Sequence, residues 1–231
     1  MATKCSILVI DLHDFPNQSS KLIAACEEWG CFRPLNHHEV LPLTLMSKMK
    51  SVVISLFDLP VEIKRRNLNV VNESGYMALT VKKPDLRGTR IIRHGLSSIN
   101  KYLFTPESVG SSGIQIHTDS GFLTILQDDE DVGGLEVMDK SGHFIPVDPW
   151  PGTLVVNIGD MAKVWSNGRF CNVKHRVQCK EATIRVSIAS FLLGPREAIE
   201  PLPELVDAEH PRAYFPTTHE DYRKLRFSTG L

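Results

Sequence analysis

Hydrophobic and polar positions follow two different patterns along this chain. In the first third, helical spacing and short apolar runs alternate, which predicts an α/β arrangement. Strands are expected over residues 7–10 and 31–35, and helices over 21–29, 42–56 and 61–66. Gly30 should end the first of these helices, because glycine readily adopts the left-handed conformation at a helix C-terminus.

From Ser98 onward the apolar stretches are short and are separated by turn residues such as Gly133-Gly134 and Ser166-Asn167-Gly168. Eight strands are expected, over residues 99–104, 113–117, 121–127, 135–138, 144–147, 153–158, 173–178 and 183–193. Such a series predicts a closed or double-sheet β architecture. The expected fold class is therefore mixed α/β with a mainly β core, a double-stranded β-helix (jelly-roll) barrel with an α/β N-terminal extension.

Residues 70–98 lie between these two parts and show no regular period. Lys82-Lys83-Pro84-Asp85 and His94-Gly95 interrupt any helical or strand pattern. A stretch of this length without structure of its own is unusual inside a compact domain.

Composition narrows the class of protein. The formal net charge of −1 gives no strong attraction to nucleic acid or to an anionic membrane. No apolar stretch approaches the roughly 18–20 residues of a membrane span, and the N-terminus lacks the apolar run of a signal peptide. The five cysteines form no CxxC pair, which favours reduced thiols. We expect a cytoplasmic protein without nucleic-acid or membrane partners; its oligomeric state is not predicted.

Two histidines and one aspartate are the main chemical signal. His117 and Asp119 stand two residues apart, and His175 follows 175 − 117 = 58 residues after His117. Residues i and i+2 of a strand point to the same face, so His117 and Asp119 can share one metal ion if the strand extends to Asp119. Two imidazoles and a carboxylate form the ligand set of non-haem Fe(II) oxygenases. The alternative is that His117-Thr118-Asp119 is a turn and His175 a core histidine.

A second signal lies in the alternating stretch Thr183–Phe191, where Arg185 and Ser187 share a face. If that face points into the barrel, the buried guanidinium requires an anionic partner. A dicarboxylate with one end on the metal and the other on Arg185 and Ser187 fits this layout. Asn100 and Tyr102 also share a face and could donate to the metal-side end of this anion. Alternatively, Arg185 points outward in a surface ion pair, and Asn100 and Tyr102 are ordinary strand residues.

The motifs around these residues resemble a known family, the plant-type 2-oxoglutarate- and Fe(II)-dependent dioxygenases. The resemblance rests on Ala25–Arg33 in the N-terminal part and on His117-Thr118-Asp119, Gly133–Val137, Asn157-Ile158-Gly159-Asp160, His175-Arg176-Val177 and Arg185-Val186-Ser187 in the barrel. A finer resemblance, carried by Gly159–Gly168 and Val177–Thr183, is to the clade that oxidises auxin.

This resemblance implies the chemistry. Fe(II) would be the cofactor, with 2-oxoglutarate and O2 as co-substrates and ascorbate as a helpful additive. The implied reaction converts indole-3-acetic acid, a small indole acid, into 2-oxindole-3-acetic acid and releases succinate and CO2. By motif, His117, Asp119 and His175 would hold the iron, and Arg185 and Ser187 the distal carboxylate of 2-oxoglutarate. Tyr102, helped by Asn100, would bind its other end.

One departure from the family pattern concerns the length of the connecting segment. Only 100 − 76 = 24 residues separate Tyr76 from Asn100, where the family carries a longer helical segment. We therefore expect an N-terminal α/β region over 1–80, a shortened connecting segment over 81–98, a catalytic domain over 99–195 and a partly helical tail over 196–231. Two alternatives remain: an oxygenase of another small plant metabolite, and a shortened inactive isoform that only binds metal and 2-oxoglutarate.

Overall fold

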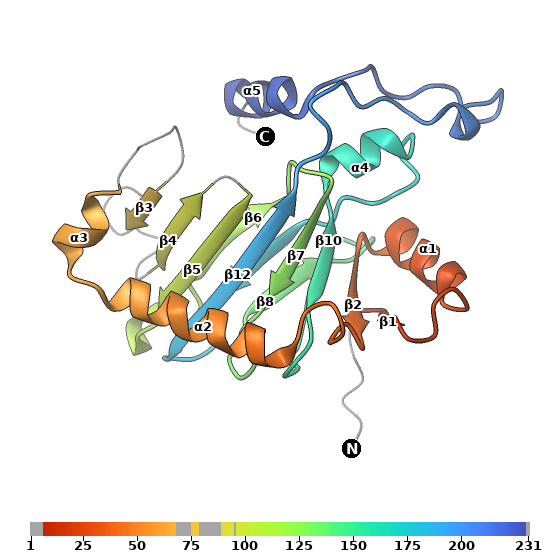
Figure 1. The fold of residues 1–231 in the computed structure, drawn as a ribbon. Helices are drawn as coiled ribbons and strands as arrows, with labels where there is room; N and C mark the ends of the chain where they lie inside the picture. The colour runs from red at the N-terminus through yellow and green to blue at the C-terminus, as the bar shows by residue number, and fades with distance from the viewer. Residues whose placement is uncertain (1–6, 68–74, 79–88, 95, 230–231) are drawn as a thin grey trace.

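The computed structural model describes residues 7–67, 75–78, 89–94 and 96–229. Two β-sheets dominate this part of the chain, and helices lie around them (Figure 1). The strands of the larger sheet, in spatial order, are β1 (Val9–Asp11), β2 (Cys31–Leu35), β10 (Val155–Ile158), β7 (Leu123–Gln127), β12 (Ile184–Leu192), β5 (Ser97–Leu103), β4 (Thr89–His94) and β3 (Gly75–Ala78). The smaller sheet has the order β6 (Ser112–His117), β11 (His175–Gln178), β8 (Leu135–Met138) and β9 (Phe144–Pro146).

The main apolar core joins the two sheets. It combines Val155, Leu126 and Ala189 of the larger sheet with Val177 and Val137 of the smaller one. Two β-sheets packed face to face, with short helices in the N-terminal part, are the jelly-roll arrangement with an α/β extension that the sequence predicts.

Alternate residues of strand β12 are buried on opposite faces of the larger sheet. It pairs with β5 on one side and β7 on the other, both antiparallel. Val186 and Ile188 pack on the outer face against Val53 and Phe57 of α2 (Leu43–Asp58). The alternate residues Arg185 and Ser187 are also buried, so the strand has no water-exposed face along its middle. This burial excludes the alternative of a surface Arg185.

The N-terminal residues extend the larger sheet rather than forming a separate layer. Strand β1 pairs in parallel with β2, and β2 pairs antiparallel with β10. Helix α1 (Ser19–Glu28) precedes Gly30, which has φ +71° as expected. A Cβ on Gly30 would lie 2.4 Å from the carbonyl oxygen of Cys171, so this position requires glycine for both its conformation and its close approach.

Within the poorly patterned segment, the described residues include strands that the sequence pattern does not predict. Strand β3 pairs with β4, and β4 pairs with β5 over six consecutive residues. The larger sheet therefore continues across the predicted boundary at residue 98. The short helix α3 (Val61–Arg65) and the helix of the tail, α5 (His219–Thr229), lie where helices are expected.

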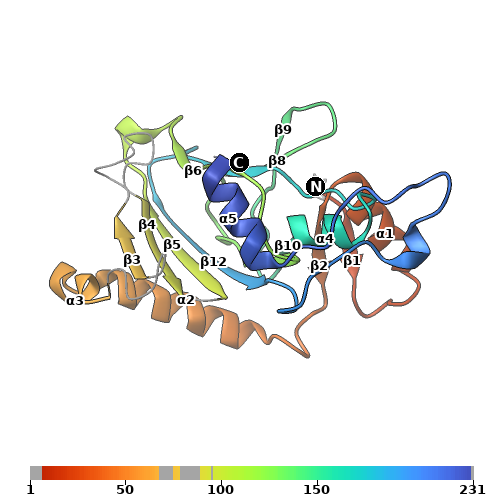
Figure 2. The same cartoon turned by 90° about the horizontal axis from the view of Figure 1, so that it is seen from above.

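The remaining short elements connect the strands. Helix α4 (Asp160–Trp165) follows β10 directly, and two 3-10 turns, η2 and η3, cover Pro106–Ser108 and Pro203–Leu205. Seen from above, α5 lies between the edges of the two sheets, close to β6, β10 and α4 (Figure 2).

Candidate active site

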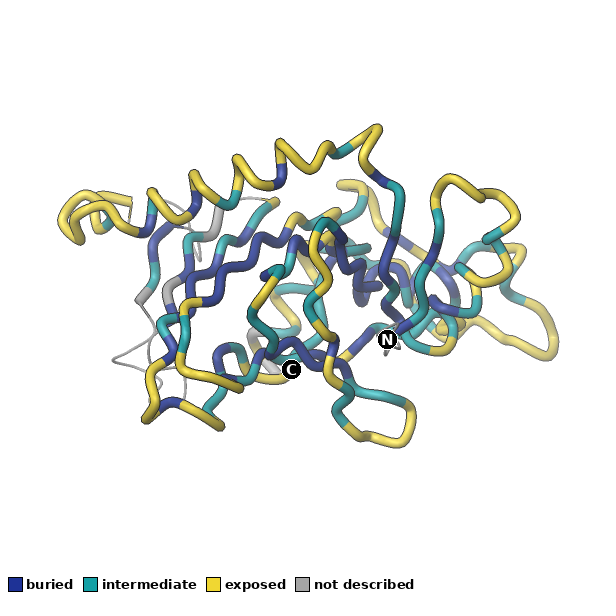
Figure 3. The backbone as a smooth tube through the Cα atoms, turned by 90° about the horizontal axis from the view of Figure 1, so that it is seen from below, coloured by how far each residue is buried: buried dark blue, intermediate teal, exposed yellow. Residues whose placement is uncertain are grey.

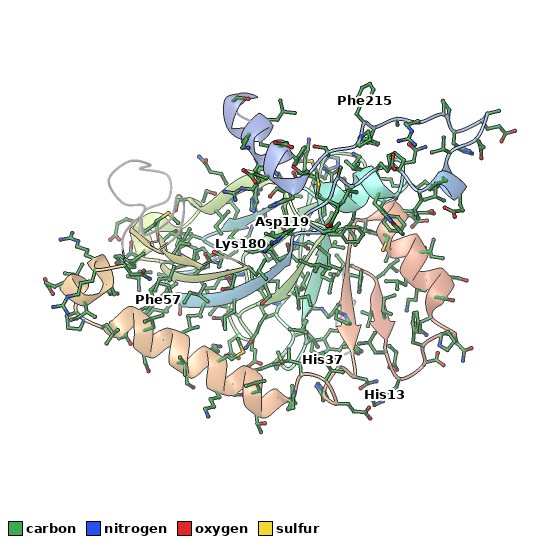
Figure 4. All side chains as sticks on the ribbon, turned by 45° about the horizontal axis from the view of Figure 1, so that its top comes forward. His13, His37, Phe57, Asp119, Lys180 and Phe215 are labelled. Atoms are coloured by element: carbon green, nitrogen blue, oxygen red, sulfur yellow. The ribbon has the colours of Figure 1, made fainter. Side chains whose placement is uncertain are left out.

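The three predicted metal ligands converge at the end of β6. His117 is the last residue of this strand, and His175, the first residue of β11, is its direct partner across the smaller sheet. Asp119 lies two residues beyond the strand, 3.8 Å from Nε2 of His117 and 3.9 Å from Nε2 of His175, and Figure 4 shows it below α5. The three ligand atoms lie within 4.8 Å of one another, a spacing that one metal ion can bridge.

Hydrogen bonds orient both imidazoles toward this common point. Nδ1 of His117 lies 2.9 Å from the Gln115 carbonyl oxygen, and Nδ1 of His175 lies 3.2 Å from that of Val173. Because a carbonyl oxygen accepts, each Nδ1 carries a proton, and in the neutral form of each imidazole the lone pair is on Nε2. The hydroxyl of Thr124 donates to Asp119 at 2.6 Å and fixes the carboxylate.

The electrostatics of the cluster suit a cation. Burial, with a contribution from His175, lowers the pKa of His117 to about 4. Burial works to raise the pKa of Asp119, but His175, His117 and the Thr124 hydroxyl outweigh it and the net shift is downward. Neutral imidazole and ionised carboxylate are the protonation states that ligate a metal. The donor set and the geometry therefore fit Fe(II).

The predicted anion site lies on the inner face of β12. Arg185 is fully buried, and its guanidinium stacks over the Tyr102 ring with 5.0 Å between the guanidinium carbon and the ring centroid. Nη2 of Arg185 donates to the carboxylate of Asp128, which follows β7. Burial works to lower the pKa of Arg185, but Asp128 outweighs it and the net shift is upward, so the guanidinium stays charged.

Several buried donors at this site are unused. Nε and Nη1 of Arg185 and the hydroxyl of Tyr102 have no hydrogen-bond partner in the described part of the chain. Buried polar groups are normally satisfied, so these atoms point to a ligand. A guanidinium carries five N–H donors, and Asp128 accepts from one. The guanidinium has two bidentate edges, one formed by Nε and Nη2 and the other by Nη1 and Nη2. Asp128 accepts one of the two Nη2 hydrogens, so one of these edges keeps both of its donors for a carboxylate.

The remaining predicted residues lie beside this guanidinium. Tyr102 is the direct cross-strand partner of Arg185, and Asn100 is that of Ser187. The Asn100 amide donates to the Ser187 hydroxyl at 3.3 Å. The structure thus groups Tyr102 and Asn100 with Arg185 and Ser187, whereas the family resemblance places them at the opposite end of the anion.

Sequence reasoning missed two carboxylates. Asp128 is the first of four consecutive acidic residues after a strand, and no pattern marks it as the one that pairs with Arg185. Asp160 appears in a family motif, but two of its contacts come from the tail, which no motif connects to the site. A buried arginine predicts a carboxylate partner in general terms only.

Comparison with known proteins decides the family. The family described as the 2OG-Fe(II) oxygenase superfamily matches residues 93–194, and the non-haem dioxygenase N-terminal family described from morphine synthesis matches residues 7–96. The 2-oxoglutarate-dependent dioxygenase DAO of Oryza sativa is 42% identical over 271 positions, which cover 92% of this chain and 90% of that protein. The chain belongs to the 2OG-Fe(II) oxygenase superfamily.

Solved structures agree with this membership. The crystal structure of the dioxygenase for auxin oxidation in rice superposes with a TM-score of 0.85 at 39% identity and covers 97% of this oxygenase and 96% of that chain. The dioxygenase for auxin oxidation 1 of Arabidopsis thaliana, in binary complex with 2-oxoglutarate, gives a TM-score of 0.80 at 44% identity over 89% and 100% of the two chains. Fe(II) is thus the cofactor of this oxygenase, and 2-oxoglutarate its co-substrate.

The alignment with the rice protein also shows that this oxygenase is shorter. It spans 271 positions, whereas the whole chain has 231 residues, so at least 271 − 231 = 40 positions have no residue here. Cys26, Cys171 and Cys179 form no disulfide in the described part of the chain. Among the described residues, no helix combines the length and apolar character that a membrane span requires.

Proposed function

We propose that this oxygenase oxidises indole-3-acetic acid to 2-oxindole-3-acetic acid and releases succinate and CO2. The similarity to rice DAO along 92% of the chain supports the substrate. The observation that carries the reaction class is the convergence of His117, Asp119 and His175 in the same barrel as a buried arginine with unused donors.

In this proposal His117, Asp119 and His175 hold the iron, and three coordination positions stay open for co-substrate and O2. Bound Fe(II) supplies the activation of O2, coupled to decarboxylation of 2-oxoglutarate. The protein fixes the ligands: the carbonyl oxygens of Gln115 and Val173 orient the two imidazoles, and Thr124 orients the carboxylate. This preorganisation would hold the three ligand side chains in place for the iron.

Arg185 binds the distal carboxylate of 2-oxoglutarate through its free bidentate edge. The hydroxyls of Ser187 and Tyr102 lie on the same surface and complete the donor set. Asn100 holds the Ser187 hydroxyl and thereby orients it. Charge-assisted hydrogen bonds are stronger than neutral ones, so this end anchors the co-substrate.

Mass spectrometry of the products from a panel of auxins and related acids tests the substrate. Purified protein with Fe(II), 2-oxoglutarate and ascorbate should add oxygen to the indole ring of indole-3-acetic acid. Oxidation of a different acid in the panel, with indole-3-acetic acid untouched, supports the alternative of another small plant metabolite. Binding of metal and 2-oxoglutarate without any product supports the inactive shortened isoform.

The location in the cell is a separate proposal. We propose that the protein is cytoplasmic, a compartment in which reduced thiols such as those of Cys26, Cys171 and Cys179 persist. Fractionation of plant cells that express a tagged chain tests this; recovery in a membrane or secreted fraction would contradict it.

A further inference from the structure

Helix α5 in the C-terminal tail contacts the turn that carries the candidate iron ligands. The helix covers His219–Thr229 and lies outside both matched family segments, which end at residue 194. Its Arg226 donates to the carbonyl oxygen of Thr118 at 3.0 Å. Thr118 is the residue between His117 and Asp119, so the tail reaches the ligand turn directly.

The carboxylate of Asp160 extends this contact into a network of hydrogen bonds. Its Oδ2 accepts from Arg226 at 2.8 Å, from the Tyr222 hydroxyl at 2.8 Å and from the Thr118 hydroxyl at 3.2 Å. Its Oδ1 accepts from the Asn172 amide at 2.6 Å. One carboxylate therefore connects α5, the ligand turn and the segment that leads to His175.

Backbone contacts hold the same turn from the other side. The amide of Asp160 donates to the Asp119 carbonyl oxygen at 2.9 Å, and that of Met161 donates to Gly121 at 3.0 Å. The Ser120 hydroxyl also lies 3.2 Å from Nε2 of His219, the first residue of α5. The ligand turn is thus enclosed between the start of α4 and the tail helix.

Among these contacts, the ion pair between Arg226 and Asp160 should be the most costly to lose. The Asp160 side chain is 4% exposed and that of Arg226 is 17% exposed, so the pair is largely removed from water. Truncating one partner of such a pair leaves the other charge buried and uncompensated, which costs far more than loss of a surface pair. Arg226 is also the cation that bonds both Asp160 and Thr118.

We propose that Arg226 of α5 is a positioning residue for the iron site, and that it acts through Asp160 and the Thr118 carbonyl to hold the turn between His117 and Asp119. The tail helix is then part of the machinery that sets metal affinity. This inference rests on the proposed ligation of iron by His117, Asp119 and His175.

The test compares three variants of α5 by metal affinity. Calorimetric titration of the full chain with Fe(II) under anaerobic conditions, or with Co(II) as a stable probe, measures the dissociation constant without turnover. Arg226→Ala should weaken binding by about 10- to 100-fold, the usual effect of losing a residue that supports a metal ligand. Arg226→Lys, which keeps the charge, should recover part of that loss. The matched control is Lys224→Ala, because Lys224 is 67% exposed on the same helix and pairs with the neighbouring carboxylates of Glu220 and Asp221.

Thermal melting of each variant without metal separates positioning from folding. If Arg226→Ala and Lys224→Ala bind metal as tightly as the wild type, the inference is wrong although the proposed function stands. A second result would also overturn the inference. If Arg226→Ala loses metal affinity only in proportion to a lower melting temperature, and Arg226→Lys restores neither the affinity nor the melting temperature, the role of Arg226 is structural. If His117→Ala binds metal as tightly as the wild type, the proposed iron site itself is wrong.

Discussion

At the scale of single residues, the metal site is the part that the sequence predicts best. The two-residue spacing predicts that His117 and Asp119 lie close together, and Nε2 of His117 and the Asp119 carboxylate are 3.8 Å apart although β6 ends at His117. The spacing of ionisable residues cannot reveal which loop carboxylate turns inward to Arg185. That choice depends on how the β7–β8 loop packs, and the structure assigns it to Asp128.

Substitution of a proposed ligand and of the proposed anchor should have different effects. His117→Ala should abolish succinate production, because two ligands remain of three. Arg185→Ala should raise the KM for 2-oxoglutarate by about 10- to 100-fold, the loss expected for hydrogen bonds to a charged group. Steady-state kinetics measure both, with His143→Ala as the control because His143 is an exposed loop histidine. Unchanged succinate production by His117→Ala, together with an unchanged KM for 2-oxoglutarate in Arg185→Ala, would falsify the site assignment.

Asp128→Asn should remove the negative charge that lies beside the Arg185 guanidinium. The variant keeps an acceptor oxygen near Nη2, so the guanidinium stays in place while its charge is uncompensated. We expect a lower melting temperature without ligand and a several-fold lower KM for 2-oxoglutarate. Scanning fluorimetry should show the stability deficit shrinking as 2-oxoglutarate is added. If the stability deficit is independent of 2-oxoglutarate, Asp128 does not influence the anion site.

At the scale of elements, strands with a clear period were predicted, and strands without one were missed. β12 alternates over its whole length and was predicted within one residue at each end. β3 has four residues and lies at the sheet edge, where β4 is its partner. Tertiary pairing rather than local pattern defines such a strand, so the sequence gives no signal for it.

The junction of β10 and α4 should be intolerant of any side chain. A Cβ on Gly159 would lie 2.2 Å from the carbonyl oxygen of Gly121 and 2.9 Å from that of Asp119. Gly159→Ala should therefore displace the ligand turn and lower both the melting temperature and the Fe(II) affinity. Gly133→Ala is the matched control, because its Cβ would meet only the Pro149 side chain, at 3.8 Å. Equal behaviour of the two variants in melting and metal titration would contradict this packing.

At the scale of the whole molecule, α2 covers the outer face of the larger sheet and leaves its own far side in water. Figure 3 shows that most of this helix is exposed, with buried positions only toward the sheet. Leu45, Met49 and Val52 are 44%, 37% and 58% exposed, at helical spacing of four and three. This apolar stripe belongs to a chain that lacks at least 271 − 231 = 40 positions of its aligned rice relative.

An exposed stripe of this kind favours association rather than folding. Replacing Leu45 and Val52 together by glutamine should reduce self-association in light scattering while leaving the melting temperature and turnover unchanged, since these side chains are already largely in water. Met46→Gln is the contrasting variant, because Met46 is buried against the sheet and its substitution should lower the melting temperature. Loss of stability in the exposed pair would show that the stripe is packed in solution.

The most direct test of the central claim is the stoichiometry of the complete reaction. Purified chain with Fe(II), O2, 2-oxoglutarate and indole-3-acetic acid should produce succinate and 2-oxindole-3-acetic acid in about equal amounts by mass spectrometry, and the His117→Ala variant should produce neither. A folded wild-type sample that binds Fe(II) but forms no succinate with or without indole-3-acetic acid would contradict the claim.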